Sequence, residues 1–170
     1  DKVVVAAGTG APALLAPLGL ALPLLARPGL LLRTHPVAAR LGRILAGPFG
    51  ALRQDREGRL HLPLSVGHQS DDASRIEGDA GALADAALAR LGRHLDLPGL
   101  AWERVMLGWR PVPADGLPVL GRAGPEGLYL AVMHSGVTLA AGVAEGMTRE
   151  IMGQGTAQGF APFSPDRFSA

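Results

Sequence analysis

The residues best suited to chemistry lie where a short apolar run meets a helical pattern. They are Met133, His134, Ser135, Gly136, Val137 and Thr138. Leu128–Val132 before them has the pattern of a buried strand, and helical periodicity starts at Val137 with apolar residues available for one side. Ser135 suits a helix N-cap, and Gly136 permits close approach to the backbone. Free N–H groups at a helix start can bind an electron-rich atom, although an ordinary strand–turn–helix corner has the same pattern.

A second candidate is Arg110, which ends an expected strand next to Pro111. Pro111, Pro113 and Pro118 favour an irregular extended turn, in which Gly116 and Gly121 permit tight turning and close approach. A guanidinium group there offers a fork that matches a carboxylate. Pairing of Arg110 with Asp115 would use the same fork to pin the turn, so both interpretations stay open.

A glycine pattern near the start is a third candidate. Gly8, Gly10 and Ala13 satisfy G-x-G-x-x-A after Val3–Ala7, which we expect to be a buried parallel strand, and Pro12 suits a first helical position. The dinucleotide fingerprint also requires an acidic residue about 20 positions later, and none is there. We therefore expect a secondary loop beside a cofactor held mainly by other residues. An NAD-binding module is the less favoured alternative.

Histidines and carboxylates give weaker indications. His35 and His68 could face a substrate cavity, whereas His61, in an alternating strand pattern, is expected to point to solvent. Asp71 and Asp72 near His68 do not assemble a ligand set by spacing, so we expect no metal. The chain has no cysteine, which excludes disulfides, thiolate catalysis and a cysteinyl-linked cofactor.

The elements that must position these residues form a mixed pattern. Helical periodicity predicts a helix over 77–95 that Asp79 can cap. The tail from Gly153 to Ala170 is expected to pack as extended chain. Antiparallel strands are predicted over 30–35, 49–52 and 59–64, and 102–109 is another candidate strand.

Composition bounds the class of protein. Of 170 residues, 48% are hydrophobic and the net charge is +1, so the chain can bury a core and does not resemble a nucleic-acid surface or a disordered tail. The apolar tract Ala11–Ala26 is interrupted by prolines and is shorter than the ~20 residues that span a bilayer. With no signal peptide visible, we expect a soluble, cytoplasmic protein whose N-terminal portion lies elsewhere.

Four spaced motifs together resemble one family. They are V-V-V-A-A-G near the start, R-P-x-P-x-D-G-L-P-V-L-G, G-L-Y-L-A-V-M-H-S-G-V-T-L-A, and S-P-x-R-F near the end. The chain is similar to the C-terminal half of the D-amino-acid oxidase family, which includes glycine oxidase, sarcosine oxidase and D-amino-acid dehydrogenase. The resemblance implies an α/β (α+β) fold: the last strands and helix of a Rossmann-like FAD domain plus an antiparallel-sheet substrate domain. The implied segments are 1–26 and 113–152 (FAD domain), 27–112 (substrate domain) and 153–170 (tail).

The resemblance also implies functional residues. It places Arg110 and His134 at the substrate, with His134 tuning the protonation of the reacting amine. Some members have a second arginine where this chain has His134, which implies a different or bulkier acid as substrate. Non-covalent FAD would be contacted by Gly8, Thr9, Gly121, Met133, His134, Ser135, Gly136, Val137 and Thr138.

The implied reaction is oxidation of an amine or amino acid, in which a hydride passes to flavin N5 and an imine forms. The family's own N-terminal G-x-G-x-x-G segment is absent from the sequence. A second polypeptide or N-terminal fragment bearing it is therefore expected against Val3–Gly10 and Val137–Met152, and the chain alone is expected neither to bind FAD tightly nor to turn over. A non-catalytic structural subunit of a flavoenzyme complex is the alternative from another class.

Overall fold

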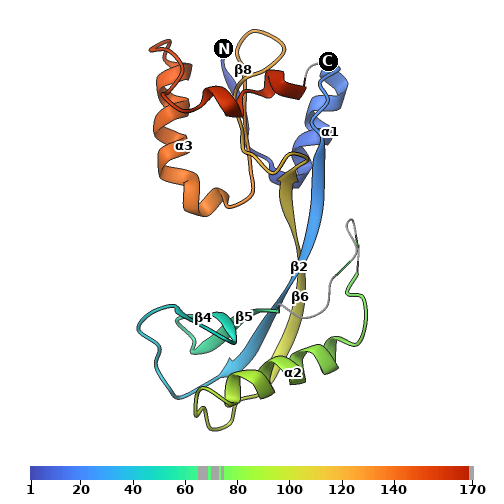
Figure 1. Ribbon diagram of the computed structural model, residues 1–170, viewed down its shortest axis with the longest axis vertical. Coiled ribbons are helices and arrows are strands. Elements are labelled where there is room, and N and C mark those ends of the chain that lie inside the picture. Colours follow the sequence, from blue (N-terminus) through green and yellow to red (C-terminus); the bar gives the residue numbers. More distant parts are fainter. Residues whose placement is uncertain (65–68, 70–72, 74, 169–170) are drawn as a thin grey trace. The chain divides into compact units, whose positions relative to one another are not determined.

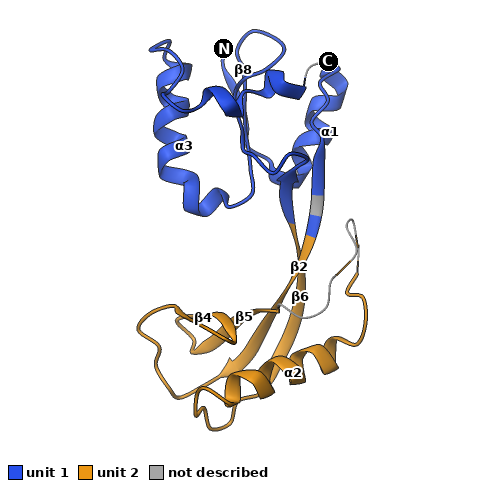
Figure 2. Ribbon diagram, in the orientation of Figure 1, with its two compact units in different colours: residues 1–27, 110–170 blue, residues 28–109 orange. Residues whose placement is uncertain are grey.

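The computed structural model describes residues 1–64, 69, 73 and 75–168 and divides the chain into two compact units. Unit 1 comprises Asp1–Arg27 and Arg110–Ala170, and unit 2 comprises Pro28–Trp109 (Figure 2). These boundaries lie next to those expected at 26/27 and 112/113. The assignment of the units to cofactor and substrate stays a prediction.

Unit 1 is built on a three-stranded sheet with the order β1-β8-β7 (Figure 1). β1 (Val3–Val5) runs parallel to β8 (Leu128–Val132), and β7 (Val119–Arg122) is antiparallel to it. The expectation that β1 is parallel is confirmed, but the expectation that it is buried is wrong, since Val3 and Val4 are 57% and 46% exposed. The reason is topological: β1 is an edge strand, and no other strand in the described residues covers its outer side.

Short helical segments follow β1. The 3-10 turn η1 (Gly8–Gly10) leads into α1 (Ala11–Leu15) and η2 (Ala16–Leu18). A proline lies in the first turn of α1, as expected, because the missing proline N–H has no partner to lose there. The helix ends before Pro17, so the G-x-G-x-x-A pattern does not open the long helix of a dinucleotide-binding unit. A search of the described residues for a helix long and apolar enough to cross a bilayer finds none.

The last long helix and the tail pack on the same sheet. Helix α3 (Gly136–Ile151) lies against it, and the tail forms the 3-10 turns η3 (Ala161–Phe163) and η4 (Pro165–Phe168). The expectation of an extended tail is therefore wrong, because prolines preset the backbone for the first residues of each turn. Phe160 and Phe163 pack against buried Leu120, Tyr129 and Met147.

Phe160 fits a notch that a glycine leaves in α3. A Cβ atom added to Gly146 would lie 2.3 Å from Phe160 Cζ, whereas one added to Gly142 meets nothing within 4 Å. We expect Gly146→Ala to destabilise the protein by about 1–3 kcal/mol through overpacking. The matched control Gly142→Ala should stabilise it by about 0.5–1 kcal/mol, since alanine favours a helix. Urea unfolding of both variants measures this, and equal effects at the two positions would contradict the proposed notch.

Unit 2 is based on a five-stranded sheet with the order β3-β4-β5-β2-β6. The pairings of β2, β4 and β5 are antiparallel, as expected. β3 was not predicted, and β6 continues through Pro111 to Pro113 because prolines are tolerated in an edge strand. The strands are β2 (Leu24–Pro36), β3 (Leu45–Gly47), β4 (Gly50–Gln54), β5 (Arg59–Leu64) and β6 (Trp102–Pro113).

Helix α2 (Ala80–Gly92) supplies one side of the core of unit 2 and is shorter than the expected 77–95. Asp79 caps it as expected, because its Oδ1 accepts hydrogen bonds from the Gly81 and Ala82 N–H groups at 2.8 and 3.2 Å. The backbone of Asp79 is extended, so the helix cannot begin earlier. The buried residues of α2 are Ala84, Ala87 and Leu91, and they pack with Leu30, Leu32, Leu52, Leu60 and Leu62 of the sheet.

His61 does not point to solvent, contrary to expectation. It lies opposite Arg33 on β2 and Arg53 on β4, it is only 9% exposed, and its Nε2 is 3.0 Å from Asp55 Oδ2. Both register partners of His61 are arginines, and the side chain of Arg33 pairs with Glu103 at 2.9 Å. The alternating pattern correctly placed His61 on the face of β5 opposite the leucines, but it could not show that His61 is buried there.

The hydrogen bond from His61 lowers the pKa of Asp55 below its usual 3.8, against the opposing effect of burial. A carboxyl group whose pKa is lower in the folded state stabilises the fold above its unfolded pKa, and this contribution is lost as pH falls through the folded value. We expect the urea concentration at the midpoint of unfolding to decrease when the pH is lowered below about 4. Asp55→Asn should make this decrease smaller. Asp96→Asn, which removes an exposed carboxylate, serves as control. An unchanged pH profile in Asp55→Asn would contradict the expectation.

Candidate functional site

The corner between β8 and α3 carries an unusual backbone conformation. Ser135 is the N-cap of α3, as expected, but its φ of +62° is left-handed, and it is the only non-glycine residue with positive φ in the described chain. Its side chain does not cap the helix; Oγ instead lies 2.7 Å from His134 Nδ1. The first N–H groups of a helix have no partner within it, so those of α3 are left without a side-chain acceptor from Ser135.

The first turn of α3 is open on its outer side. Val137 is 96% exposed, so the expectation that it joins an apolar packed side is wrong. The reason is that α3 packs through residues further along, where Gly146 and Met147 are buried. His134, Ser135, Gly136 and Thr138 are exposed as well. The corner therefore presents backbone donors and a large apolar side chain together.

Gly8 and Thr9 lie at the same edge of the sheet as this corner. β1 and β8 are parallel neighbours, so the residues that follow their carboxyl ends meet at one edge. Ala6 after β1 and Met133 after β8 line the same groove, which supports this placement. Gly8 has φ +56°, which favours glycine. In open α/β sheets, ligands bind outside this edge.

Arg110 belongs to a segment that approaches the same loop. A Cβ atom added to Gly8 would lie 3.7 Å from Cγ of Pro111, the residue after Arg110. Arg110 is exposed, and its Nε donates to the Arg27 carbonyl oxygen at 3.4 Å. The pairing of Arg110 with Asp115 is not formed, because Asp115 pairs with Arg167. The structure therefore brings Gly8, Thr9 and the Arg110 segment towards the carboxyl edge that ends in Met133–Thr138.

Gly121 is not brought to this edge. Its φ is +118°, and a Cβ atom there would lie 3.2 Å from Glu150 Oε1, near the last turn of α3. The same Glu150 oxygen accepts the Arg122 N–H at 3.0 Å. Because α3 rises about 1.5 Å per residue, Glu150 is at the opposite end from Ser135. A contact of Gly121 with the cofactor stays a prediction from the sequence.

Comparison with known proteins identifies the family of the chain. The family described as FAD dependent oxidoreductase (DAO) matches residues 1–150. The chain belongs to this family. Its fold is that of the C-terminal half of such enzymes, as the sequence predicts: strands and a helix of the FAD domain together with an antiparallel sheet.

Individual relatives show how much of a full-length family member this chain spans. An opine oxidase subunit of Rhizobium meliloti is 32% identical over 99% of this chain and 44% of its own length. D-amino acid dehydrogenase of Cereibacter sphaeroides is 31% identical over 100% of this chain and 39% of its own length. Glycine oxidase of Geobacillus kaustophilus superposes with a TM-score of 0.72 at 25% identity, covering 98% of this chain and 45% of that one. The chain thus spans less than half the length of each of these proteins.

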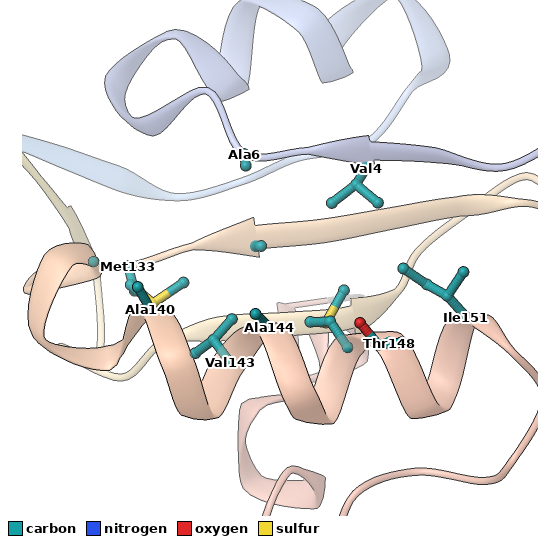
Figure 3. A pocket seen from close by; sticks show the side chains of 11 residues that line it. Val4, Ala6, Met133, Ala140, Val143, Ala144, Thr148 and Ile151 are labelled. Atoms are coloured by element: carbon teal, nitrogen blue, oxygen red, sulfur yellow. The ribbon is translucent and has the colours of Figure 1, made fainter.

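An apolar groove of about 410 Å³, which the sequence did not predict, lies in unit 1. Figure 3 shows Val4 from β1 facing residues of α3 across it. No lining residue is charged, and periodicity could not show that this side of the helix stays uncovered. The lining residues are Val4, Ala6, Ala131, Met133, Gly136, Ala140, Val143, Ala144, Met147, Thr148 and Ile151.

Arg167 is a second feature that the sequence alone did not identify. Its Nε and Nη2 donate to both carboxylate oxygens of Asp115, at 2.6 and 3.1 Å. Nη2 also donates to the Leu117 carbonyl oxygen, and Nη1 donates to those of Phe163 and Ser164. These five bonds match the five N–H donors of a guanidinium group. The hydrogen bond from Arg167 lowers the pKa of Asp115. In the sequence, Arg167 was part of the S-P-x-R-F motif, but nothing there indicated its partner.

The remaining candidates are outside the corner. His35 is exposed at the end of β2 in unit 2, and its N–H donates to the Ala101 carbonyl oxygen, so its expected cavity role is untested. His68, Asp71 and Asp72 lie outside the described residues. Within the part of the chain that the structure describes, no three His, Asp or Glu side chains gather as metal ligands.

Proposed function

We propose that this chain forms the flavin-facing half of an FAD-dependent oxidoreductase that oxidises an amine or amino acid. The observation that carries the proposal is the exposed first turn of α3, which begins at a left-handed Ser135 whose side chain does not cap it. Membership of the FAD-dependent oxidoreductase family supports FAD as the cofactor. The similarity to D-amino acid dehydrogenase and to glycine oxidase supports amino-acid chemistry.

The corner suits the electron-accepting ring of a flavin. The backbone N–H groups of Gly136, Val137 and Thr138 would face its pyrimidine edge, where negative charge develops, with Met133, His134 and Ser135 beside it. A helix start stabilises such charge by ~0.3–1 kcal/mol when exposed and up to ~2 kcal/mol when partly buried. Bound FAD supplies a hydride acceptor for the carbon that bears the amine, so that an imine forms.

Two further groups of this chain would act around that ring. Gly8 and Thr9, after the neighbouring parallel strand, would approach the adenosine or pyrophosphate part through their backbone. Arg110, whose segment reaches Gly8, would hold a substrate carboxylate with its planar fork.

His134 would lie between substrate and cofactor. Its Nδ1 interacts with Ser135 Oγ, and this contact orients the imidazole so that Nε2 can face the reacting amine. In that position the ring would accept or return a proton of the amine. A histidine in place of a second arginine favours a different or bulkier acid than a simple amino acid.

The active unit includes more polypeptide than this chain. The chain covers 44% of the opine oxidase polypeptide from Rhizobium meliloti, and that relative is itself one subunit of an enzyme. We propose that a segment bearing G-x-G-x-x-G, in a second polypeptide or in the rest of a longer chain, completes the FAD site. A cytoplasmic location stays a prediction from the sequence.

An absorbance spectrum tests this proposal. The purified chain mixed with FAD should retain no stoichiometric flavin after gel filtration, because the primary nucleotide loop is missing. After reconstitution with that missing segment, it should retain flavin that an amino-acid substrate bleaches without oxygen. Tight stoichiometric flavin on the chain alone, or a flavin-free reconstituted complex, would contradict the proposal. A complex that binds flavin yet oxidises no amine would favour the structural-subunit alternative.

A further inference from the structure

The C-terminal tail is bonded to the turn that follows β6. The turn has its own restraint, because the Gly116 N–H donates to the Pro113 carbonyl oxygen at 2.7 Å. Arg167 adds a second one, since two of its N–H donors bind the Asp115 carboxylate and its side chain is only 19% exposed. A bidentate pair between a guanidinium and a carboxylate fixes orientation as well as distance. The position of the turn therefore depends on the tail.

Two backbone acceptors carry this restraint to Arg110. In the same turn, the Ala114 N–H donates to the Pro23 carbonyl oxygen at 3.0 Å, directly before β2. Within β2, the Arg27 carbonyl oxygen accepts from Arg110 Nε at 3.4 Å. The end of β6 is thus joined to the start of β2 both beyond Arg110 and at its guanidinium group. A shift of the turn would move the backbone of β6 relative to the oxygen that orients this guanidinium.

The apolar end of the tail packs near the other part of the proposed site. Phe168 packs against the apolar cluster of unit 1 that contains Leu15 of α1, and Cζ of Arg167 lies 4.4 Å from the centre of the Phe168 ring. Helix α1 follows the loop that contains Gly8, and a Cβ atom on Gly8 would lie 3.7 Å from Cγ of Pro111. One segment of chain therefore packs on the core that includes α1 and also binds the turn after β6.

We propose that Arg167 is a positioning residue for Arg110, and that it acts through its bonds to Asp115 and the turn after β6. The inference rests on the proposed function, because it takes Arg110 as the residue that binds the substrate carboxylate. It adds that the affinity for this carboxylate depends on the C-terminal tail. A correctly placed guanidinium fork makes two parallel bonds to a carboxylate, and a displaced one cannot. The effect of Arg167 is therefore expected on substrate binding and not on hydride transfer.

Steady-state kinetics of the reconstituted enzyme tests this inference. Arg167→Ala should raise KM for an amino-acid substrate by about tenfold or more, since a misplacement of about 1 Å can cost roughly 100-fold, while kcat changes less than about threefold. For an amine that lacks the carboxylate, KM should stay within about threefold of the parent value. Arg167→Lys should recover part of the affinity. Asp115→Asn, which keeps one neutral acceptor oxygen, should raise KM less and gives the answer if Arg167→Ala does not fold.

A second measurement needs neither flavin nor turnover. Hydrogen exchange of the Ala114 N–H in this chain reports whether the turn is still bonded to the Pro23 carbonyl oxygen. Arg167→Ala should accelerate this exchange by about tenfold or more, because the turn then opens locally. Leu91→Ala is the control for a general loss of stability, because it leaves a cavity in the core of unit 2. It should change neither the exchange rate nor KM by more than about threefold.

The outcomes separate this inference from the proposed function. Faster Ala114 exchange, together with a KM increase confined to the carboxylate substrate, supports a positioning role. Unchanged exchange, or equal KM increases for both substrates, overturns it and leaves Arg167 a role in stability alone. A KM increase in Arg110→Ala that Arg167→Ala does not share overturns this inference only. Unchanged kinetics of Arg110→Ala, or a complex that oxidises no amine, would instead overturn the proposed function, and the inference with it.

Discussion

Arg110→Ala in the reconstituted enzyme should lower kcat/KM for an amino-acid substrate by about 100-fold or more, with most of the effect in KM. Breaking a charged, hydrogen-bonded pair with a bound carboxylate costs roughly 2–5 kcal/mol, and each 1.36 kcal/mol is a factor of ten. Arg110→Lys should recover only part of the loss, because an ammonium group cannot make the two parallel bonds of a guanidinium fork. Steady-state kinetics with D-amino acids and with N-substituted amino acids measures the effect.

The control for this experiment is Arg104→Ala, which removes another exposed arginine from β6. It should leave kcat/KM within about threefold, as surface substitutions usually do. For an amine substrate that lacks the carboxylate, kcat/KM should be the same for the parent enzyme and for Arg110→Ala. Unchanged kinetics of Arg110→Ala would remove Arg110 from the substrate site and would favour the structural-subunit alternative.

Arg167→Ala should destabilise the protein by about 3 kcal/mol, the largest stability effect that we expect from an exposed or half-buried position. The substitution removes five hydrogen bonds, including both from the guanidinium to the Asp115 carboxylate. Asp115 Oδ1 keeps the Leu117 N–H as a donor, and the Ser164 carbonyl oxygen keeps the backbone N–H of position 167. Arg167→Lys should recover less than half, since lysine offers three donors from one point. Urea unfolding followed by circular dichroism measures these differences.

Arg149→Ala is the matched control for Arg167. Arg149 is an exposed arginine in the last turn of α3, where a positive charge stabilises a helix by only ~0.3–1 kcal/mol. A double-mutant cycle of Arg167→Ala and Asp115→Ala should show coupling, because the two side chains share two bonds. If Arg167→Ala lowers the free energy of unfolding by no more than Arg149→Ala does, the side-chain hydrogen bonds of Arg167 do not stabilise the fold.

Local sequence patterns predicted helices, strands and caps better than they predicted the burial of individual side chains. The β8–α3 corner, the Asp79 cap and the strand 59–64 follow from apolar periodicity and capping chemistry, which act within a few residues. His61 was placed wrongly because the strands beside it, β2 and β4, are distant in sequence or separated from it by a turn. Val3 was placed wrongly because no strand among the described residues pairs with the outer edge of β1.

The candidate site was predictable only in part, for the same reason. Met133–Thr138 are continuous in sequence, and their residue types indicate a strand end followed by a helix start. The corner could therefore be found from the sequence. The pairing of Asp115 with Arg167 could not, since fifty-two positions separate them and Arg110 is a nearer arginine. The proximity of Gly121 to Glu150 could not be predicted either, because the two residues are far apart in sequence.

The division of the chain into one continuous and one discontinuous unit has a consequence for biosynthesis. Unit 2 is a single stretch, Pro28–Trp109, and can form as soon as that stretch leaves the ribosome. β1 cannot pair with β8 until more than a hundred further residues have been made, so Val3–Val5 stay unpaired during that interval. We therefore expect nascent chains to acquire protease resistance in the middle first, and the end segments to depend on chaperones until synthesis is complete.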